Sequence, residues 1–414
     1  MRLIGVASIA LALALTFIMS GFDTAVTAQP LAGQSQGDDR RSGRAIFRFD
    51  TFGDEQLWTD VLRMHEVIAT IDPATALAVG LKVDVEALPP RIVAALRAGR
   101  VDLTDPAVTI ELLRLNAVVG VRGNVDATGQ LTSVGITCAL CHSTVDNSLT
   151  TGIGRRLDGW ANTDLNVGAI VALSPSPLLD DETRAEFNSW GPGKYDPRHH
   201  AFDGVDIRLL NSPDPSVPIV IPPIYGLKGV GFETFTGDGT ISYWNSYVGV
   251  GQMGGKGNFS DWRIGLFIRQ SPDLVTPKLP ALLDYQLSLK RPEPPRNSFN
   301  RAAASRGEDL FRSEAGCATC HRGPTFTDVL SGPSPTMPFL HDPAEVGTDP
   351  RYASRSATKQ YRTTPLRGLW QHPPYFHDGS APDLPAVVNH YDRQFDLKLT
   401  AAQKADLVEF LKSL

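Results

Sequence analysis

Apolar residues recur at helical spacing in several stretches of the chain. In TAAQKADLVEFLKSL, residues 400–414, four apolar positions share one helical face, and Thr400 with Gln403 forms a capping box at the start. A second helix is predicted in SRGEDLFRSEAGC, where Leu310 and Phe311 form the apolar side. Both patterns are typical of amphipathic helices that bury one face.

Two further helices are expected upstream. Asp105 and Pro106 start the segment that continues through VTIELLRLNAVVGV, residues 108–121. In DEQLWTDVLRMHEVI, residues 54–68, the apolar face of a helix would include His65. Glycine and proline, 37 and 31 residues, break the rest into loops, with short strands expected in NSPDPSVPIVIPPIYG. The chain is therefore expected to be mainly α, with long loops and a few short strands.

Residues 1–28 have the order of a secretory signal peptide. Arg2 precedes an apolar stretch, residues 11–19, and small residues end at Ala28. An uncleaved membrane anchor is the alternative, but the apolar run is shorter than the roughly 20 residues that a span needs. We therefore expect an exported, periplasmic protein with no membrane span after cleavage.

The stretch KRPEPPRN, residues 290–297, predicts a linker because of its prolines and charges. It would separate an N-terminal extension and domain, 29–290, from a C-terminal domain, 298–414. The formal net charge is −6 and no long basic run occurs, which argues against a nucleic-acid partner.

All four cysteines fall in two C-x-x-C-H motifs. Cys138 and Cys141 precede His142, and Cys317 and Cys320 precede His321. This spacing is typical of covalent haem c: both thiols add to the haem vinyl groups, and the adjacent histidine reaches the iron.

Other uses of these cysteines explain less. Disulfides are common in exported proteins, but they do not account for a histidine after each pair. A thioredoxin-like motif should open a helix after a strand, and a four-cysteine zinc site would leave both histidines without a role. Two covalent haem c groups are therefore predicted, in two cytochrome c-like domains.

The chain resembles the bacterial di-haem cytochrome c peroxidase superfamily, which includes the di-haem enzyme that matures tryptophan tryptophylquinone and, more distantly, the rubber oxygenases. The resemblance is strongest over GCATCHRGPTFTD and TTPLRGLWQHPPYFHDGSAPDLPAVVNHYD, residues 316–328 and 363–392. It implies that His142 carries a reactive haem, where peroxide or oxygen reacts. It implies that His321 carries a haem that stores electrons and is closed by a sixth ligand.

In the peroxidases that sixth ligand lies fourteen residues after the histidine of the PYFH motif, which here is His377. The corresponding residue is Tyr391, as in the quinone-maturing enzyme, whereas the rubber oxygenases use histidine. In DLPAVVNHYD, Tyr391 falls roughly 15° from the centre of the apolar helical face, and His390 falls more than about 110° away. Tyr391 is therefore predicted to be the sixth ligand. His390 and Met337, which follows the second C-x-x-C-H motif, are the alternatives.

The family places a tryptophan between the two haems. The related segment here is FETFTGDGTISYWN, residues 232–245, in which Thr236 stands at the tryptophan position. Trp244 is the candidate for the electron relay, and a packed core tryptophan is the alternative. His65 is interpreted as a core histidine, with a sixth ligand of the first haem as the alternative.

Peroxide cleavage also needs a general acid and base over the open iron, a glutamate in the peroxidases. The chain has GVGQMGGKGNF where that glutamate is expected, so Glu233 and Asp238 are the nearest acidic candidates. A calcium ion between the haems is common in the family, but the family's threonine ligand is replaced by His372.

These patterns lead to one main hypothesis. The protein is expected to be a periplasmic di-haem oxidoreductase that takes electrons from a small reducing protein, a cytochrome or cupredoxin, or from an organic substrate. A haem dioxygenase acting on an apolar substrate and a non-catalytic electron-transfer cytochrome are the alternatives.

Overall fold

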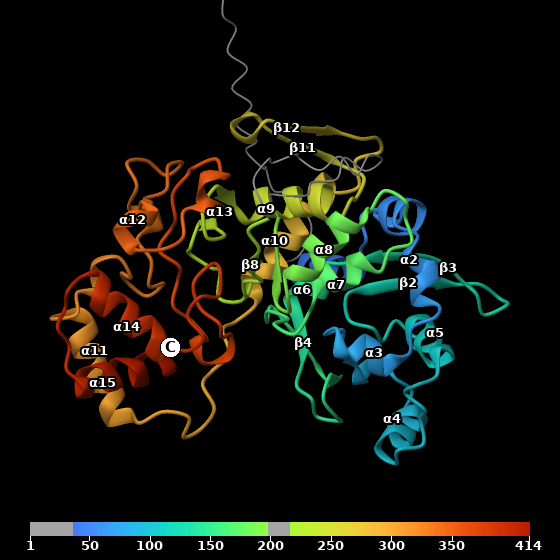
Figure 1. Ribbon diagram of the computed structural model, residues 1–414, viewed down its shortest axis with the longest axis horizontal. Helices are drawn as coiled ribbons and strands as arrows, with labels where there is room; N and C mark the ends of the chain where they lie inside the picture. The colour runs from blue at the N-terminus through green and yellow to red at the C-terminus, as the bar shows by residue number, and fades with distance from the viewer. Residues whose placement is uncertain (1–35, 198–215) are drawn as a thin grey trace, which may run out of the picture. The chain divides into compact units, whose positions relative to one another are not determined.

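The computed structural model describes residues 36–197 and 216–414, so the expected signal peptide at 1–28 lies outside the described residues. Helices joined by long loops make up most of the regular structure (Figure 1). The α-helices are α1 Gln36–Phe49, α2 Met64–Ile68, α3 Pro73–Ala78, α4 Pro90–Arg97, α5 Pro106–Arg114, α6 Ala139–His142, α7 Val167–Ala172, α8 Asp181–Ser189, α9 Ile241–Tyr247, α10 Leu279–Ser288, α11 Arg301–Arg312, α12 Pro343–Val346, α13 Arg351–Ser354, α14 Leu384–Gln394 and α15 Ala401–Lys412.

The strands are short and form six two-stranded ladders within the described residues. The pairs are β1 Val83–Asp84 with β5 Ile153–Gly154, β2 Val121–Val125 with β3 Leu131–Ile136, β4 Ser143–Val145 with β6 Arg156–Asp158, β7 Lys194–Tyr195 with β8 Ile219–Val220, β9 Phe232–Glu233 with β10 Gly239–Thr240, and β11 Asn258–Asp261 with β12 Leu266–Arg269. The expectation of a helical fold with few short strands is confirmed in outline, while the division into two haem domains remains a prediction.

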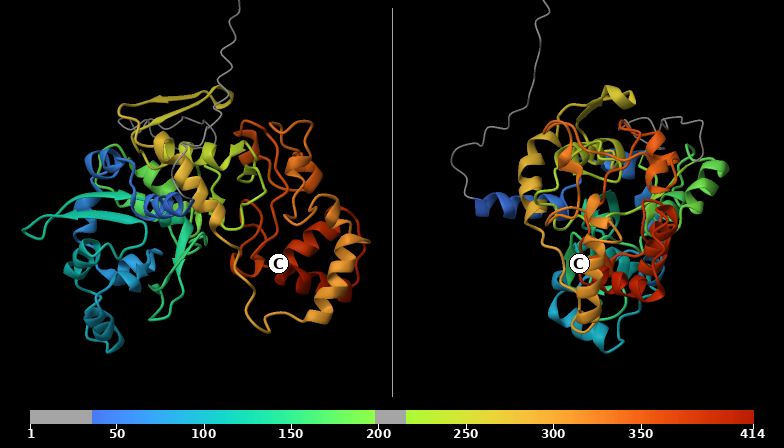
Figure 2. Two further views of the ribbon diagram at one scale, coloured as in Figure 1. Left: turned by 180° about the vertical axis from the view of Figure 1, so that it is seen from behind. Right: turned by 90° about the vertical axis from the view of Figure 1, so that its left-hand side faces the viewer.

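The three C-terminal helices α11, α14 and α15 gather around one apolar cluster (Figures 1 and 2). Gly307 lets α11 lie directly on α15, because a Cβ at this position would overlap the Asp406 carbonyl. Phe311 meets Phe410 with ring centroids 5.2 Å apart. The predicted capping box of Thr400 is confirmed at the start of α15. An opening helix, the second C-x-x-C-H motif and a closing helix therefore share one core.

The helix predicted to run through residue 121 is shorter than expected. α5 begins after Asp105, whose carboxylate accepts a hydrogen bond from the Ala107 N–H, but it ends at Arg114. Asn116 takes a left-handed conformation, with φ of 54°, which ends the helix. Val121 then starts the β2–β3 hairpin. Apolar periodicity alone could not locate this break, because residues 115–121, LNAVVGV, are mostly apolar on both sides of Asn116.

The helix predicted over residues 54–68 is also interrupted. A π-helical turn spans Gln56–Val61, and Arg63 adopts a left-handed conformation before α2 begins. His65 therefore lies on a separate short helix rather than on the face that carries Trp58. The shared face that the sequence predicted for these residues was wrong.

The chain between α10 and α11 contains no helix or strand over residues 289–300. Arg291 within it donates a hydrogen bond of 3.0 Å to the Leu414 carbonyl, so this segment contacts the end of the chain. The domain boundary at 290–297 stays a prediction. Within residues 36–197 and 216–414, no helix is both long and apolar enough to cross a membrane.

Candidate functional site

The first C-x-x-C-H motif ends on α6 and is fixed by backbone contacts on both sides. Gly120 approaches Leu140 so closely that any side chain at residue 120 would overlap it. The Gly159 N–H donates to the His142 carbonyl at 2.8 Å, and the Asn162 N–H donates to the Cys141 carbonyl at 2.9 Å. These contacts hold the two cysteines and the histidine on one short, rigid segment.

The histidines of the two motifs are oriented in the same way. His142 Nδ1 lies 3.0 Å from the Pro222 carbonyl, and His321 Nδ1 lies 3.1 Å from the Phe326 carbonyl. A carbonyl oxygen can only accept, so Nδ1 carries the hydrogen and Nε2 keeps its lone pair. Burial lowers the pKa of His142 to about 4 and lowers the pKa of His321. Both imidazoles are therefore neutral and suited to bind a metal through Nε2.

A cavity of about 570 Å³ opens beside the second motif. Cys317, Cys320 and His321 line one part of it, and apolar residues of α14 and α15 line another. Its wall also includes Pro222, whose carbonyl accepts the hydrogen bond from His142. One loop thus contacts the histidine of the first motif and the cavity of the second. A deep apolar cavity beside a neutral histidine and two thiols fits haem c.

Tyr391 is the candidate sixth ligand that faces this cavity. Its side chain lines the cavity from α14, where burial raises the pKa of the phenol to about 12. His390 is turned elsewhere, because its Nε2 lies 2.9 Å from the Val346 carbonyl. Met337 is 55% exposed. The geometry therefore favours Tyr391, in agreement with the helical wheel.

Two arginines, one buried and one half-buried, give the cavity a cationic side. Arg362 and Arg367 both line it, and Arg362 pairs with Glu233 at 3.3 Å. Burial lowers the pKa of Arg367 to about 10, and the neighbouring Arg362 charge adds to this effect. Glu233 is also buried, so two guanidinium groups share one carboxylate. This excess positive charge suits an anionic ligand, and the two haem propionates would supply such anions.

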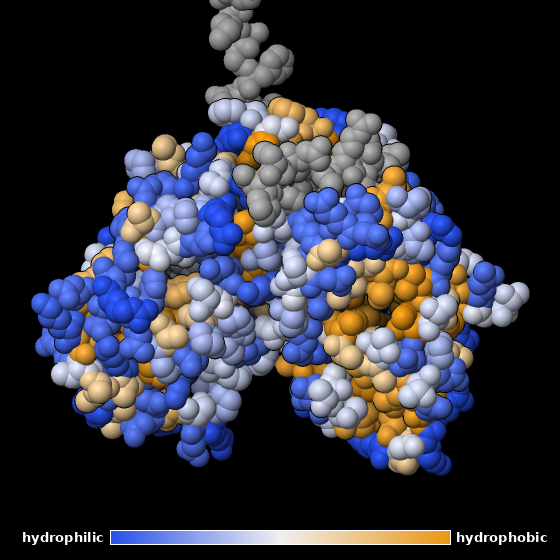
Figure 3. All heavy atoms as spheres, viewed as in Figure 1, coloured by the Kyte–Doolittle hydropathy of each residue, from blue (hydrophilic) through white to orange (hydrophobic). Residues whose placement is uncertain are grey.

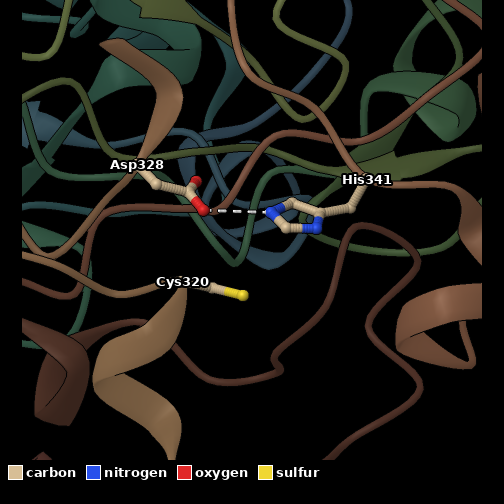
Figure 4. A group of neighbouring side chains, drawn as sticks. All are labelled: Cys320, Asp328 and His341. Atoms are coloured by element: carbon tan, nitrogen blue, oxygen red, sulfur yellow. Dashed lines mark hydrogen bonds and ion pairs between the residues drawn. The ribbon is translucent and has the colours of Figure 1, made fainter. Parts of the chain in front are cut away.

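Cys320 lies in a compact polar cluster with Asp328 and His341 (Figure 4). His341 Nε2 lies 3.2 Å from Asp328, and its Nδ1 lies 2.8 Å from Glu345. The hydrogen bond to Asp328, together with contacts to Cys320 and Glu345, raises the pKa of His341 to about 11. His341 thus forms an ion-paired cluster with Asp328 and Glu345 beside Cys320 of the second motif.

The acidic residues expected over the first haem have other surroundings. Glu233 contacts Arg362, which lines the cavity beside the second motif. Asp238 accepts hydrogen bonds from Thr236 at 3.1 Å and from the Thr358 N–H at 3.3 Å. Neither set of contacts includes His142. A role for either carboxylate in proton transfer at the first haem stays a hypothesis.

Trp244 belongs to the core behind the first motif. It is buried on α9, with ring centroids 5.6 Å from Tyr243 and 5.3 Å from Tyr247. The same apolar cluster contains Phe47 and Ala139. Because Ala139 stands between the two cysteines of the first motif, the apolar cluster that contains Trp244 reaches this motif.

A pair of tryptophans, which the sequence did not single out, connects the two sites. Trp160 and Trp370 meet edge to face, with ring centroids 5.7 Å apart. Trp160 follows β6, which pairs with the strand directly after His142. Trp370 lies between Leu369 and His372 in the chain, and both of these residues line the cavity beside the second motif. Only the contact itself reveals the pair, because the two residues are far apart in the chain.

His372 and His377 also line the cavity beside the second motif. His377 accepts or donates a hydrogen bond with the Tyr361 hydroxyl at 3.1 Å, and its carbonyl accepts from the Val220 N–H. Burial lowers the pKa of His372 to about 4, so it faces the cavity as a neutral group. The calcium ion suggested by the resemblance remains a prediction.

The two C-x-x-C-H motifs and the cavity beside the second one are features expected of a cytochrome c-like haem protein. Residues 360–395, which include both cavity arginines and Tyr391, match the family of RoxA-like, cytochrome c-like domains. The methylamine utilization protein MauG of Methylorubrum extorquens is 34% identical over 131 residues, which cover 27% of this chain and 35% of MauG. The cytochrome-c peroxidase IdrP1 of a Pseudomonas species is 31% identical over 147 residues, covering 26% of this chain and 39% of that protein.

These matches relate the chain to the di-haem cytochrome c peroxidase superfamily, as the motifs predicted. The chain spans somewhat more than a third of the length of these relatives, so their activities are not transferred to it here. Among solved structures, hydrazine synthase of Kuenenia stuttgartiensis matches with a TM-score of 0.30 and 23% identity, covering 48% of this chain and 72% of that chain.

Proposed function

We propose that the protein is a periplasmic di-haem c-type oxidoreductase of the peroxidase kind. It would reduce hydrogen peroxide, or activate oxygen, at a haem held by Cys138, Cys141 and His142. A second haem, held by Cys317, Cys320 and His321, would pass electrons to it. The observation that carries the proposal is the cavity in which Tyr391 and His321 both line the wall beside the second cysteine pair.

The haem irons would supply the redox chemistry, in which one hydrogen peroxide takes up two electrons and two protons to give two water molecules. The chain's contribution begins with ligand orientation. The carbonyls of Pro222 and Phe326 hold the Nδ1 hydrogens of His142 and His321, so that each Nε2 points away from the backbone. An anionic Tyr391 oxygen would stabilise the more oxidised states of the second iron.

The two arginines of the cavity would hold the carboxylates of the second haem. Arg362 and Arg367 present charged donors in a site that excludes most water, where each hydrogen bond to an anion is strengthened. Glu233 would balance one of these charges and keep Arg362 in place. In this proposal Glu233 acts on cofactor binding rather than on proton transfer to peroxide.

The Trp160–Trp370 contact supports a route for electrons between the two sites. Indole rings are oxidisable, and here two of them are in contact between the two haem-attachment segments. Tyr225 extends the group, with its ring centroid 6.4 Å from that of Trp160 and its hydroxyl donating to the Gly368 carbonyl at 3.2 Å. Trp244 remains the alternative relay. A small reducing protein or an organic substrate would supply the electrons.

A haem dioxygenase is the second candidate, and one observation favours it. The acidic candidates Glu233 and Asp238 make their contacts away from His142, which leaves the first haem without an identified proton donor. Fast peroxide cleavage depends on such a group, whereas oxygen binding does not.

Spectroscopy of the purified holoprotein tests the proposal. We expect EPR signals from one high-spin and one low-spin haem, and a change in the optical spectrum within seconds of adding a stoichiometric amount of hydrogen peroxide. A stable oxygen complex without a response to peroxide would favour the dioxygenase. Two low-spin haems that ignore both reagents would contradict an enzymatic role.

A further inference from the structure

A second cavity contains no residue of either C-x-x-C-H motif in its wall. It has a volume of about 230 Å³ and lies between α3, α4, α5 and the strand pair β1–β5. Its wall includes Leu77, Leu96, Val108, Leu112 and Ile153. Figure 3 shows apolar side chains gathered over this part of the molecule, where the surface is hollowed.

We infer that this cavity is a binding site for a small, uncharged hydrocarbon-like molecule, such as a substituted benzene or a short aliphatic chain. The inference is independent of the proposed haem chemistry, because none of the residues in this wall belongs to either motif. The ligand class follows from the size of the cavity, the chemistry of its wall and the packing of α4.

The size suits a ligand somewhat larger than benzene. An apolar cavity of about 150 Å³ stays dry and binds benzene or xenon in an otherwise well-packed protein. At about 230 Å³, this cavity has room for an aromatic ring with a short alkyl group. A void of this size between close-packed elements leaves many side chains without partner atoms on one side, and an apolar ligand would restore those contacts.

The wall selects against charge. Of the residues around the cavity, Glu111 is the charged one, and it forms an ion pair with Arg114 at 2.7 Å on the exposed side of α5. The other lining residues are alanine, valine, leucine, isoleucine or proline. A ligand carrying a carboxylate or an ammonium group would lose its hydration without gaining a partner.

α4 closes one side of the cavity without forming a filled core. Ile92 and Leu96 line the cavity and remain half-buried, while Arg91, Ala94 and Arg97 on the same helix are exposed. No residue of α4 is fully buried. An amphipathic helix normally packs its apolar face against other side chains. Here the apolar face of α4 lines the cavity instead, so the helix would cover a bound ligand and would also be the element that the ligand passes on entry.

Isothermal titration calorimetry of the holoprotein with ethylbenzene and with 4-ethylbenzoate tests this site. We expect saturable binding of ethylbenzene and at least about tenfold weaker binding of 4-ethylbenzoate, because the charged group cannot be solvated in the cavity. Leu96→Trp should fill the cavity and abolish ethylbenzene binding. Ala94→Trp adds the same group on the exposed side of α4 and should leave binding unchanged.

Haem absorbance and the melting temperature establish whether each variant is folded. Should Leu96→Trp fail to fold, Leu96→Ala provides the second test, because the enlarged cavity should then prefer n-butylbenzene over ethylbenzene. Absence of saturable binding to the wild type, equal binding of the charged and uncharged probes, or full binding to folded Leu96→Trp would each overturn the inference.

Discussion

Replacing Glu233 by glutamine distinguishes two roles for this carboxylate. Glu233 and Arg362 are both buried and lie 3.3 Å apart, with Arg367 also beside the same cavity. Removing the negative charge leaves the buried Arg362 guanidinium and the half-buried Arg367 guanidinium without the Glu233 carboxylate. Breaking a buried ion pair costs about 3–5 kcal/mol, and glutamine retains one acceptor oxygen, so we expect a loss near about 3 kcal/mol.

Urea denaturation of the holoprotein, followed by circular dichroism, measures this loss as a decrease in the free energy of unfolding. Glu308→Gln is the matched control. Glu308 pairs with Arg312 at 2.9 Å, but both side chains are largely exposed, so its loss should cost less than about 0.5 kcal/mol.

The kinetics of the same variant refute or support the assignment. If Glu233 holds Arg362, the rate of the peroxide reaction at the first haem should change by less than about twofold in the protein that retains both haems. A general acid or base contributes about 10²- to 10⁴-fold. A loss of that size with an unchanged free energy of unfolding would refute our reasoning and return Glu233 to the role that the sequence suggested.

Three further predictions concern the helices, the polar cluster and the tryptophan pair. Gly307→Ala should lower the free energy of unfolding by about 2 kcal/mol in urea denaturation, because overlap with the Asp406 carbonyl outweighs a helix-propensity gain of about 1 kcal/mol. A stabilised variant would contradict the close packing of α11 and α15. The raised pKa of His341 means that its contribution to stability is complete below pH 6.5 and is lost as the pH rises toward about 11. Wild-type stability should therefore decline over that range, and His341→Gln should flatten the profile of stability against pH. Parallel profiles of the two proteins would exclude His341 as the source of the decline. Trp370→Phe should slow electron transfer between the haems by at least about tenfold in flash photolysis while leaving both haem spectra unchanged, because Trp370 is the ring that contacts Trp160. An unaltered rate would favour Trp244 as the relay.

Local patterns in the sequence predicted the C-terminal helices well. The apolar face of α15, its capping box and the orientation of Tyr391 all depend on residues within three or four positions of each other, which is the range that helix geometry controls. The breaks at Arg63 and Asn116 were missed, because a left-handed residue leaves no signal in apolar periodicity. Both residues end a helix that the pattern alone would continue.

Contacts between distant segments could not be predicted from one sequence. The pairing of Glu233 with Arg362 joins residues 129 positions apart, and the Trp160–Trp370 contact joins residues 210 positions apart. Burial and charge decide such contacts only once the chain has folded. The sequence therefore suggested the cysteines, the histidines and Tyr391 as candidates, whereas Arg362, Arg367 and the Trp160–Trp370 contact emerged only from the fold.

The most direct test of the account is the ligand of the second haem. EPR spectra of Tyr391→Phe and His390→Gln, compared with the wild type, separate two neighbouring residues of α14 that the structure turns in different directions. Our account predicts that Tyr391→Phe loses the low-spin signal of the C-terminal haem, because an oxygen ligand is removed, and that His390→Gln retains it. An unchanged signal in Tyr391→Phe, with loss of the signal in His390→Gln, would contradict the assignment of Tyr391 and the oxidised-state role proposed for it.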